Sequence, residues 1–351
     1  MRSNCLVPRQ VLALPGLIHS ASSRTRRYWA LGAATALFCF GTQAYAVSCA
    51  TESQMTNAQR AEYVRALRAL EAPIQAGNAD AVKAMTVASV AASFEGIAQS
   101  IQSLSPQIQG AAFTIGSMYQ LNASDLKTPQ EETQFFCSVP GSSLVVTATI
   151  PQLPPGIYLL ALLHATGVQH PQQVALILQK DGDDWKLAGF FVRPMSLGGR
   201  EGVWYWAQAR QYAQKRQDWN SYFYYETAAF LLTPVDFLMS PNLEKLQKEA
   251  QTVRPPELPG AEPMKLAGNG QTFEITSVRT DGFAGELDLV VNYRAKDVSD
   301  PVAARTEILA LMKALLAGHP ELRQAFHGLW VYANAPNQRP YAIELPMGDI
   351  H

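Results

Sequence analysis

Histidines are the side chains of this sequence that could most readily perform acid–base chemistry or bind a metal. The chain has six, and those beyond residue 46 are His164, His170, His319, His327 and His351. His164 and His170 are separated by a probable loop, which is not the spacing of two ligands on one helix face. No paired Cys-x-x-Cys and no His-Glu-x-x-His is present. The sequence therefore predicts no metal site and no cofactor.

His164 is the one candidate for a catalytic residue. It follows the apolar run Ile157–Leu163, at the end of a predicted strand. In an apolar pocket, a histidine or a carboxylate with a raised pKa could serve as acid or base. Asp125 or Glu95 could pair with His164, although nothing in the sequence orients them. The alternative, which we favour, is that His164 hydrogen-bonds a backbone group at the strand end.

Residues 204–225 hold an unusual density of aromatic side chains with interleaved arginines. Tryptophan, tyrosine and arginine dominate protein-interface energetics, and aromatic rings can also stack on the sugars of a cell-wall polymer. Alternatively, these rings pack one helical hairpin against the rest of the chain. If the segment is a recognition surface, the residues that we expect to bind a ligand or partner are Trp204, Tyr205, Arg210, Tyr224 and Tyr225.

The adjacent tyrosines Tyr224 and Tyr225 constrain this segment further. Neighbouring residues of a helix point in different directions, so these two side chains cannot both face one core. At least one of them must meet another domain, a ligand or water.

Residues 1–46 resemble an export signal. A basic lead ends in Arg26-Arg27, an uncharged apolar stretch runs from Trp29 to Phe40, and Ala44-Tyr45-Ala46 is the small-x-small pattern that signal peptidases cut. The segment Thr25–Trp29 also resembles a twin-arginine leader. We expect cleavage after Ala46 and a location in the periplasm or outside the cell.

Cleavage would leave two cysteines, Cys49 and Cys137. Two cysteines in an exported protein most simply form one disulfide. The alternative is that Cys49 carries a lipid, because Ala46-Val47-Ser48-Cys49 resembles a lipobox.

The predicted mature chain is mildly acidic. The leader contains five of the 28 Lys and Arg residues, which leaves 23 basic against 29 acidic residues and a formal charge of −6. Nucleic-acid binding needs clustered positive charge, so the composition argues against it. No later apolar run reaches the length needed to span a membrane. We expect a protein partner of the envelope or a small apolar ligand.

Residues 50–196 form the first of three predicted blocks. Thr56 and Gln59 are spaced as a capping box at the start of a helix. A second helical stretch, Ala79–Leu104, follows it. From residue 112 the apolar period changes to two, which predicts a run of antiparallel strands and an α+β fold. The predicted strands are Ala112–Leu121, Gln134–Ser138, Ser143–Ile150, Ile157–His164, Val174–Lys180 and Trp185–Arg193.

The order of helices and strands in this block, and its final hairpin Asp181–Phe191, resemble the cone-shaped nuclear-transport-factor-type or SnoaL-like fold. The resemblance implies a curved antiparallel sheet that forms a half-open barrel with an apolar pocket. It implies no reaction, because this fold accommodates enzymes, binders and assembly modules alike.

Residues 197–251 are predicted to be helical. We expect helices over Val203–Gln217 and from Asp218 to Leu232, and a third that Ser240-Pro241 caps. The spacing of Trp206, Ala229 and Pro234 is similar to that of a tetratricopeptide repeat. Only one copy is present, and a solenoid needs at least about three, so we interpret the pair as a lone helical hairpin.

Residues 252–263 are proline-rich and read as a stiff linker. They precede a small α/β domain, residues 264–351, with a predicted β-β-α-β-β order. Its first two strands are expected to join across Asp281-Gly282, and Asp300-Pro301 to cap its helix, which Gly318 ends.

Two functions follow from the sequence. The preferred one is an exported, non-enzymatic binding or scaffold protein of the bacterial cell envelope, because the layout is modular, aromatic residues are in excess and no catalytic motif is present. The alternative is a small apolar ligand carrier, or an acid/base enzyme, that uses the pocket of the cone and His164.

Overall fold

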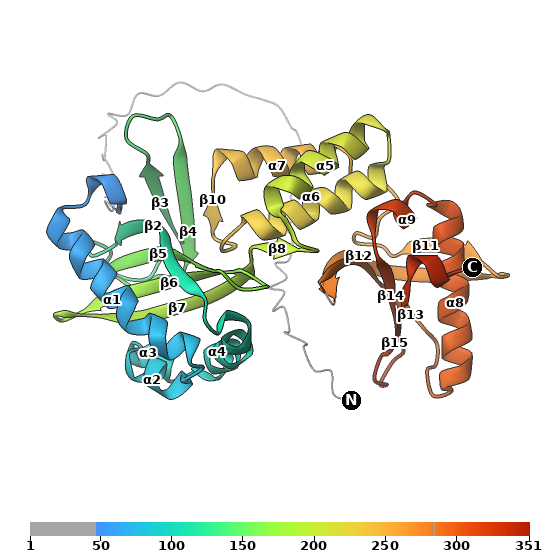
Figure 1. Cartoon of the computed structure of the whole chain (residues 1–351), viewed down its shortest axis with the longest axis horizontal. Coiled ribbons are helices and arrows are strands. Elements are labelled where there is room, and N and C mark those ends of the chain that lie inside the picture. Colours follow the sequence, from blue (N-terminus) through green and yellow to red (C-terminus); the bar gives the residue numbers. More distant parts are fainter. Residues whose placement is uncertain (1–46, 284) are drawn as a thin grey trace, which may run out of the picture. The chain divides into compact units, whose positions relative to one another are not determined.

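The computed structural model of the chain describes residues 47–283 and 285–351 (Figure 1). The predicted export signal and its cleavage site after Ala46 lie outside the described residues. The described part contains helices and several mainly antiparallel sheets, none of which closes into a barrel. This confirms the predicted α+β class.

The first α-helix of the first block is α1 (Asn57–Gln75), and its predicted capping box is present. The Thr56 side chain accepts a hydrogen bond from the Gln59 amide at 3.2 Å, and the Gln59 side chain accepts one from the Thr56 amide at 2.9 Å. These two bonds satisfy amide groups that the start of a helix otherwise leaves without partners.

The stretch that was predicted as one helix, Ala79–Leu104, is three helices: α2 (Ala79–Ala84), α3 (Ala88–Ala91) and α4 (Glu95–Ile108). The first break has a clear cause. Thr86 forms a parallel bridge with Leu187, whose amide donates to Met85 and whose carbonyl accepts from Val87. The chain therefore leaves the helix in order to pair with a strand, which a helical residue pattern does not reveal.

The first sheet has the strand order β1-β2-β5-β6-β7. The strands β3 and β4 leave this sheet and form a second one with the short β10, in the order β10-β4-β3. All the strands predicted in this block are present, as β2 (Ala112–Asn122), β3 (Glu132–Ser138), β4 (Val145–Pro151), β5 (Ile157–Thr166), β6 (Gln172–Asp181) and β7 (Asp184–Pro194). The short strands β1 (Ser48–Thr51) and β10 (Leu238–Met239) were not predicted.

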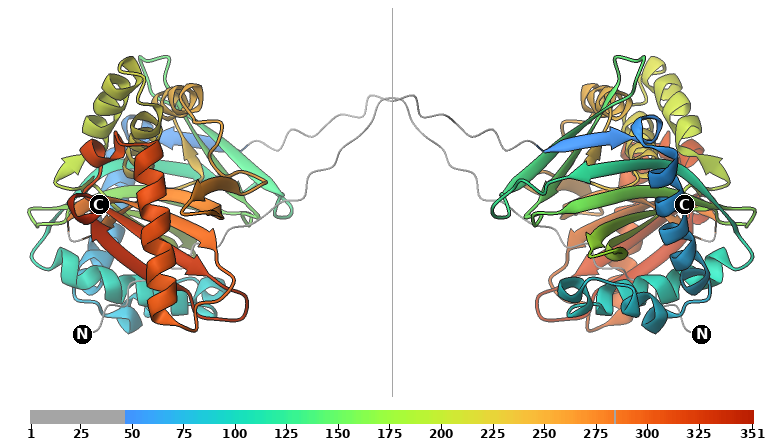
Figure 2. Two further views of the ribbon diagram at one scale, coloured as in Figure 1. Left: turned by 90° about the vertical axis from the view of Figure 1, so that its right-hand side faces the viewer. Right: turned by 90° about the vertical axis from the view of Figure 1, so that its left-hand side faces the viewer.

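Both faces of the first sheet are buried. Alternate residues of β5, such as Leu159 and Leu163, pack with α1 and α4, which lie on one face (Figure 2, right). The residues between them, such as Leu160, pack with Phe135 of β3 and Ala148 of β4 on the other face. This burial on two sides explains why β5 reads as an unbroken apolar run.

The hairpin Asp181–Phe191 is anchored to α1. Gly182 has a φ of +61°, which suits glycine at the tip between β6 and β7. Glu62 of α1 accepts hydrogen bonds from the Lys180 ammonium at 2.6 Å and from the Trp185 indole at 2.7 Å. Trp185, which belongs to the motif on which the resemblance rests, therefore helps to hold this hairpin against α1.

The predicted disulfide is confirmed. Cys49 of β1 and Cys137 of β3 are bonded, with a Cα–Cα distance of 5.0 Å, and the bond links the first sheet to the second. A cross-link over 88 residues stabilises the fold by about 4 kcal/mol in the chain-entropy account. The sulfur of Cys49 is part of this bond and cannot also carry a lipid, so the disulfide and lipidation of Cys49 exclude one another. An intramolecular disulfide is consistent with a location outside the cytoplasm.

Residues 197–251 form helices as predicted. They are α5 (Gly202–Gln214), α6 (Asp218–Leu232) and α7 (Pro241–Thr252), and the strands β8 (Ser196–Leu197) and β9 (Arg200–Glu201) precede them. The hydroxyl of Ser240 accepts a hydrogen bond from the Leu243 amide at 3.3 Å, so it caps α7. In the described part of the chain no helix is long and apolar enough to cross a membrane.

The C-terminal domain has a five-stranded sheet in the order β11-β12-β13-β14-β15, and α8 crosses one face of it (Figure 2, left). Only the pair β13–β14, which α8 and α9 connect, is parallel. The elements are β11 (Met264–Gly268), β12 (Gln271–Phe283), β13 (Glu286–Arg294), α8 (Pro301–Gly318), α9 (Leu322–Ala325), β14 (Gly328–Asn334) and β15 (Tyr341–Pro346).

This domain differs from the prediction in three places, which are the additional strand β11, the additional short helix α9 and the turn after β12. The strand β11 was missed, because five residues directly after a proline-rich segment carry little periodicity. Asp281-Gly282 was expected to form the turn, but Asp281 pairs with Asp288 and Gly282 with Leu287, so β12 continues to Phe283. A side-chain hydrogen bond from the Gly282 amide to Asp281 accompanies this extension.

One apolar core joins the α5–α6 hairpin to the C-terminal sheet. It includes Phe223 of α6, Leu289 of β13 and Ile308 of α8. Leu258, from the proline-rich segment 252–263, is buried in the same core, and the neighbouring Glu257 accepts a hydrogen bond from the Trp219 indole at 2.7 Å. The prolines therefore mark a segment that packs along the hairpin.

Candidate functional site

The three tyrosines that sequence analysis put forward for partner binding are interior. Tyr205, Tyr224 and Tyr225 are 2%, 6% and 3% exposed. Their hydroxyls donate to the Leu197 carbonyl at 3.0 Å, the Ala325 carbonyl at 2.8 Å and the Glu249 carboxylate at 3.2 Å. Burial raises the pKa of Tyr205 and of Tyr225 to about 12, and that of Tyr224 further. The expectation that Tyr224 and Tyr225 cannot both face one core was wrong, because both belong to the apolar core that α6 shares with the C-terminal sheet. Their hydroxyls reach different neighbours, the C-terminal domain and α7.

Arg210 and Trp206 converge with Tyr225 on one carboxylate. Arg210 makes two hydrogen bonds to Glu249 of α7, at 2.7 and 2.8 Å, and the Trp206 indole donates to it at 2.8 Å. The hydrogen bond from Arg210 is the largest of the effects that lower the pKa of Glu249 to about 2. Arg210 thus fastens α5 to α7. Trp204 packs edge-on against Tyr205 at 5.0 Å and is partly exposed.

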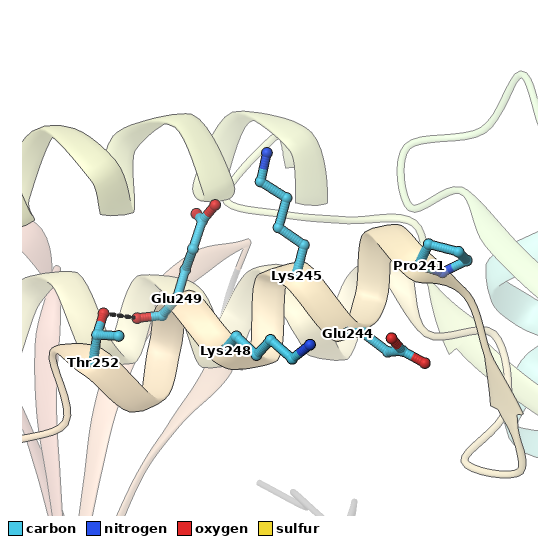
Figure 3. A pocket seen from close by; sticks show the side chains of 6 residues that line it. All are labelled: Pro241, Glu244, Lys245, Lys248, Glu249 and Thr252. Carbon is cyan, nitrogen blue, oxygen red and sulfur yellow. Dashed lines mark hydrogen bonds between the residues drawn. The ribbon is translucent and has the colours of Figure 1, made fainter. Parts of the chain in front are cut away.

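A surface depression runs along α7 (Figure 3). All the residues that line it belong to this helix, so it brings together no groups from separate elements. Its lining consists of Pro241, Glu244, Lys245, Lys248, Glu249 and Thr252. A ligand site normally collects polar groups from several elements in a concave pocket, and this depression does not.

His164 lies on the face of β5 that points away from the helices, because its side chain alternates with Leu163 and shares a face with Leu162. Its Nε2 is 3.2 Å from the Gln173 side-chain amide, and its ring lies over Gly116 of β2. Among the described residues, no hydrogen bond or ion pair joins it to Asp125 or Glu95. The helix-covered face, where the resemblance implies a pocket, is packed with apolar side chains.

A different group of ionisable side chains comes together in the C-terminal domain. Asp288 of β13, His327 just before β14 and Glu344 of β15 each place one nitrogen or oxygen atom within 4.8 Å of the others. We call these three residues the carboxylate–histidine cluster. Strand pairing assembles it: Leu289 is opposite Leu329 in the parallel ladder, and Trp330 is opposite Glu344 in the antiparallel one. The cluster lies on the sheet face opposite to the shared core, since Leu289 and Val291 face that core.

Asp288 is the centre of the cluster and the one fully buried carboxylate of the described residues. Its Oδ2 accepts a hydrogen bond from the Trp330 indole at 3.0 Å, and its Oδ1 is 3.2 Å from Nδ1 of His327. The His327 side chain is 44% exposed, so one edge of the cluster is open to solvent. A buried carboxylate is thereby placed beside a histidine that solvent can reach.

Gly328 makes room for the two carboxylates. A Cβ at this position would lie 2.8 Å from Oε1 of Glu344 and 2.9 Å from Oδ1 of Asp288, closer than real Cβ contacts allow. Burial and then the charge of Asp288 raise the pKa of Glu344. The carboxyl groups of Asp288 and Glu344 therefore lie close together at Gly328, which has no side chain.

Sequence reasoning missed this cluster, although His327 was among the histidines considered. The three residues belong to no local motif, and Asp288 and His327 are 39 positions apart. One signal was available: Asp288 interrupts the apolar run Leu287–Val291 of a buried strand, where a carboxylate is costly.

Comparison of the chain with models of protein families, with curated proteins and with solved structures found no match in any of the three.

Proposed function

We propose that this chain is an exported binding protein of the bacterial cell envelope, and that its ligand site is the carboxylate–histidine cluster. The observation that carries the proposal is the fully buried Asp288, held beside His327 and Glu344. An ionised carboxylate that leaves water loses several kcal/mol of solvation, which an apolar side chain in the same strand would not lose. Such costly groups concentrate at functional sites.

The disulfide supports the location. Cys49 and Cys137 pair as expected for a protein that folds in an oxidising compartment, and residues 1–46 have the pattern of an export signal. The cone-like resemblance of residues 50–196 fits a supporting role, because the helix-covered face of the first sheet is packed with apolar side chains.

The α5–α6 hairpin packs against the domain that carries the carboxylate–histidine cluster, and we assign it a structural role. Its predicted binding residues Tyr205, Tyr224 and Tyr225 make internal hydrogen bonds, and α6 shares a core with the sheet that carries the cluster. The hairpin would therefore hold the C-terminal domain in place, and recognition would take place at the cluster.

Native mass spectrometry of the mature protein, purified gently from the periplasm of its host, tests this function. We expect a bound species on the wild-type chain and its loss from Asp288→Asn. Asp236→Asn is the matched control, because it removes a carboxylate that is 88% exposed and pairs with Arg193. A bound species that survives Asp288→Asn, or its absence from the wild-type chain, would contradict the proposal.

Acid/base catalysis at the same cluster is the second candidate. The contact between His327 Nδ1 and Asp288 resembles the way a carboxylate orients a general base, and the ring is open to solvent. This moves the enzyme hypothesis from His164 to His327. Turnover of a substrate that His327→Gln abolishes and His164→Gln leaves unchanged would favour it over simple binding.

A further inference from the structure

We infer that the carboxylate–histidine cluster binds a divalent transition-metal cation. This inference rests on the proposed function and names the ligand of that site. Two carboxylates and one imidazole offer oxygen and nitrogen donors, a set that suits zinc and its neighbours better than magnesium or calcium, which prefer oxygen alone.

The distances between the donor atoms fit such an ion. Donors at about 2.0–2.2 Å from a tetrahedral Zn²⁺ are themselves ~3.4 Å apart. Oδ1 of Asp288 and Nδ1 of His327 are 3.2 Å apart, so a metal fits where these two atoms now face one another. A carboxylate oxygen of Glu344 lies within 4.8 Å of one donor atom of Asp288 and one of His327, and this half-buried side chain can close the gap by rotation.

The surroundings already hold the central donor in place. The Trp330 indole fixes Oδ2 of Asp288 and leaves Oδ1 directed at His327, which is how outer hydrogen bonds orient metal-binding carboxylates. The His327 backbone is fixed on both sides, because its amide donates to Leu287 at 2.9 Å and its carbonyl accepts from Met347 at 2.8 Å. Two of the three ligands are thus positioned before the metal arrives.

The local charge and space also favour a cation. Asp288 and Glu344 bring two carboxylates together over Gly328, whose missing Cβ leaves the position between them free of side-chain atoms. A divalent ion between them would replace mutual repulsion by attraction. Three protein donors leave at least one coordination position for water or for an atom of a larger ligand, on the side where His327 is exposed.

Calorimetric titration with Zn²⁺ alone tests the inference. The mature chain, free of any histidine tag and stripped with a chelator, is expected to bind one Zn²⁺. His327→Gln, Glu344→Gln and Asp288→Asn should each weaken binding by more than the about 10–100-fold that loss of an outer partner costs, and Trp330→Phe by roughly that amount. His164→Gln and Asp236→Asn remove a matching histidine and carboxylate elsewhere and should leave the affinity unchanged.

Three results would overturn the metal site: no zinc binding by the wild-type chain, equal binding by the ligand variants, or preference for Mg²⁺ over Zn²⁺. Circular dichroism shows whether Asp288→Asn folds. If it does not, the metal site is tested by the zinc affinity of His327→Gln, whose side chain is partly exposed in the wild type, and by the visible spectrum of Co²⁺ bound to the wild-type chain. Failure here is distinct from failure of the proposed function. Suppose that the wild-type chain binds an organic molecule or a protein that Asp288→Asn does not bind, and that titration with Zn²⁺ gives no binding. This result would refute the metal site and would support the proposed binding function.

Discussion

Gly328 shows how one residue without a side chain can define a site. The carboxylates of Asp288 on β13 and Glu344 on β15 lie next to it, and a methyl group on its Cα would overlap both of them. Both Asp288 and Glu344 would then have to shift.

We expect Gly328→Ala to lower the free energy of unfolding by about 1–3 kcal/mol, the usual cost of inserting atoms into a packed site. Chemical denaturation followed by fluorescence measures it. Gly318→Ala is the control, because a Cβ at this position in α8 meets nothing within 4 Å. It should be neutral or stabilising by up to about 1 kcal/mol. Equal losses in both variants would mean that Gly328 is not crowded.

Glu249 makes the stability of the helical segment depend on pH. Its pKa is about 2 in the folded protein, against 4.5 for a free glutamate, chiefly because Arg210 hydrogen-bonds the charged form. A lowered folded-state pKa adds stability that is complete above pH 4.5 and disappears as the pH falls towards about 2.

Glu249→Gln should therefore be less stable than wild type at pH 6, and the difference should vanish between about pH 4.5 and pH 2. Urea unfolding at a series of pH values, read from tryptophan fluorescence, measures it. Glu244→Gln changes an exposed carboxylate of the same helix and should leave the pH profile unaltered. A constant difference between Glu249→Gln and wild type at every pH would refute the prediction.

What the sequence reveals about single residues depends on how far apart the partners are. The caps at Thr56 and Ser240 are correct because each acts on an amide three residues away. Cys49 and Cys137 could be paired because two cysteines leave one choice. Asp288, His327 and Glu344 could not be predicted, since the parallel ladder β13–β14 and the pairing of β15 bring them together.

At the level of elements, β13, α8 and β14 form the unit that builds the cluster. A parallel pair of strands needs a long crossover, and α8 supplies it. Asp300 caps this helix as predicted, since its Oδ1 accepts hydrogen bonds from the amides of Val302 at 2.8 Å and Ala303 at 3.3 Å.

Asp300→Ala is expected to lower the free energy of unfolding of the C-terminal domain by about 1 kcal/mol, the typical value of an N-cap side chain. Asp300→Asn keeps an acceptor oxygen and should retain most of the stability. Equilibrium denaturation of both variants measures the two effects. Identical losses in Ala and Asn would show that charge at the helix start, and not the hydrogen bonds, stabilises α8.

Element bounds could be predicted where burial repeats regularly and failed where pairing is remote. The strands predicted in the first block were found from their apolar patterns, whereas the short β1 was missed. The helix over residues 79–104 was wrong, because Leu187 of β7 draws residues 85–87 out of it. The turn at Asp281-Gly282 was wrong, because residues with strong turn preferences extend β12 when the opposite strand pairs with them.

At the scale of the whole molecule, the composition indicated a domain boundary across which side chains nevertheless pack into one core. The prolines of residues 252–263 suggested a linker, yet Leu258 is buried in the core that α6 and the C-terminal sheet share. Proline content signals stiffness but does not say which side chains between the prolines become buried. Two separate cores serve the first block.

This division of cores predicts which segments unfold together. Tyr224 joins α6 to the C-terminal domain through a hydrogen bond to Ala325, at 2.8 Å, and Asn220 adds one to Glu321 at 2.9 Å. Removing the Tyr224 hydroxyl leaves the Ala325 carbonyl without that donor in a buried place, which costs about 1–3 kcal/mol. Since α6 and the C-terminal sheet share one core, the loss should reach both.

Hydrogen exchange measured by mass spectrometry distinguishes a joint unit from two independent ones. In Tyr224→Phe, peptides from α6 and from β14 should lose protection by the same factor, whereas β5 peptides should keep theirs. Tyr158→Phe is the reciprocal control, because its hydroxyl donates to Pro154 within the first block, and it should affect β5 and spare α6. Loss of protection in α6 alone would mean that the hairpin opens without the C-terminal domain. The carboxylate–histidine cluster would then stand on a domain that folds independently of the hairpin.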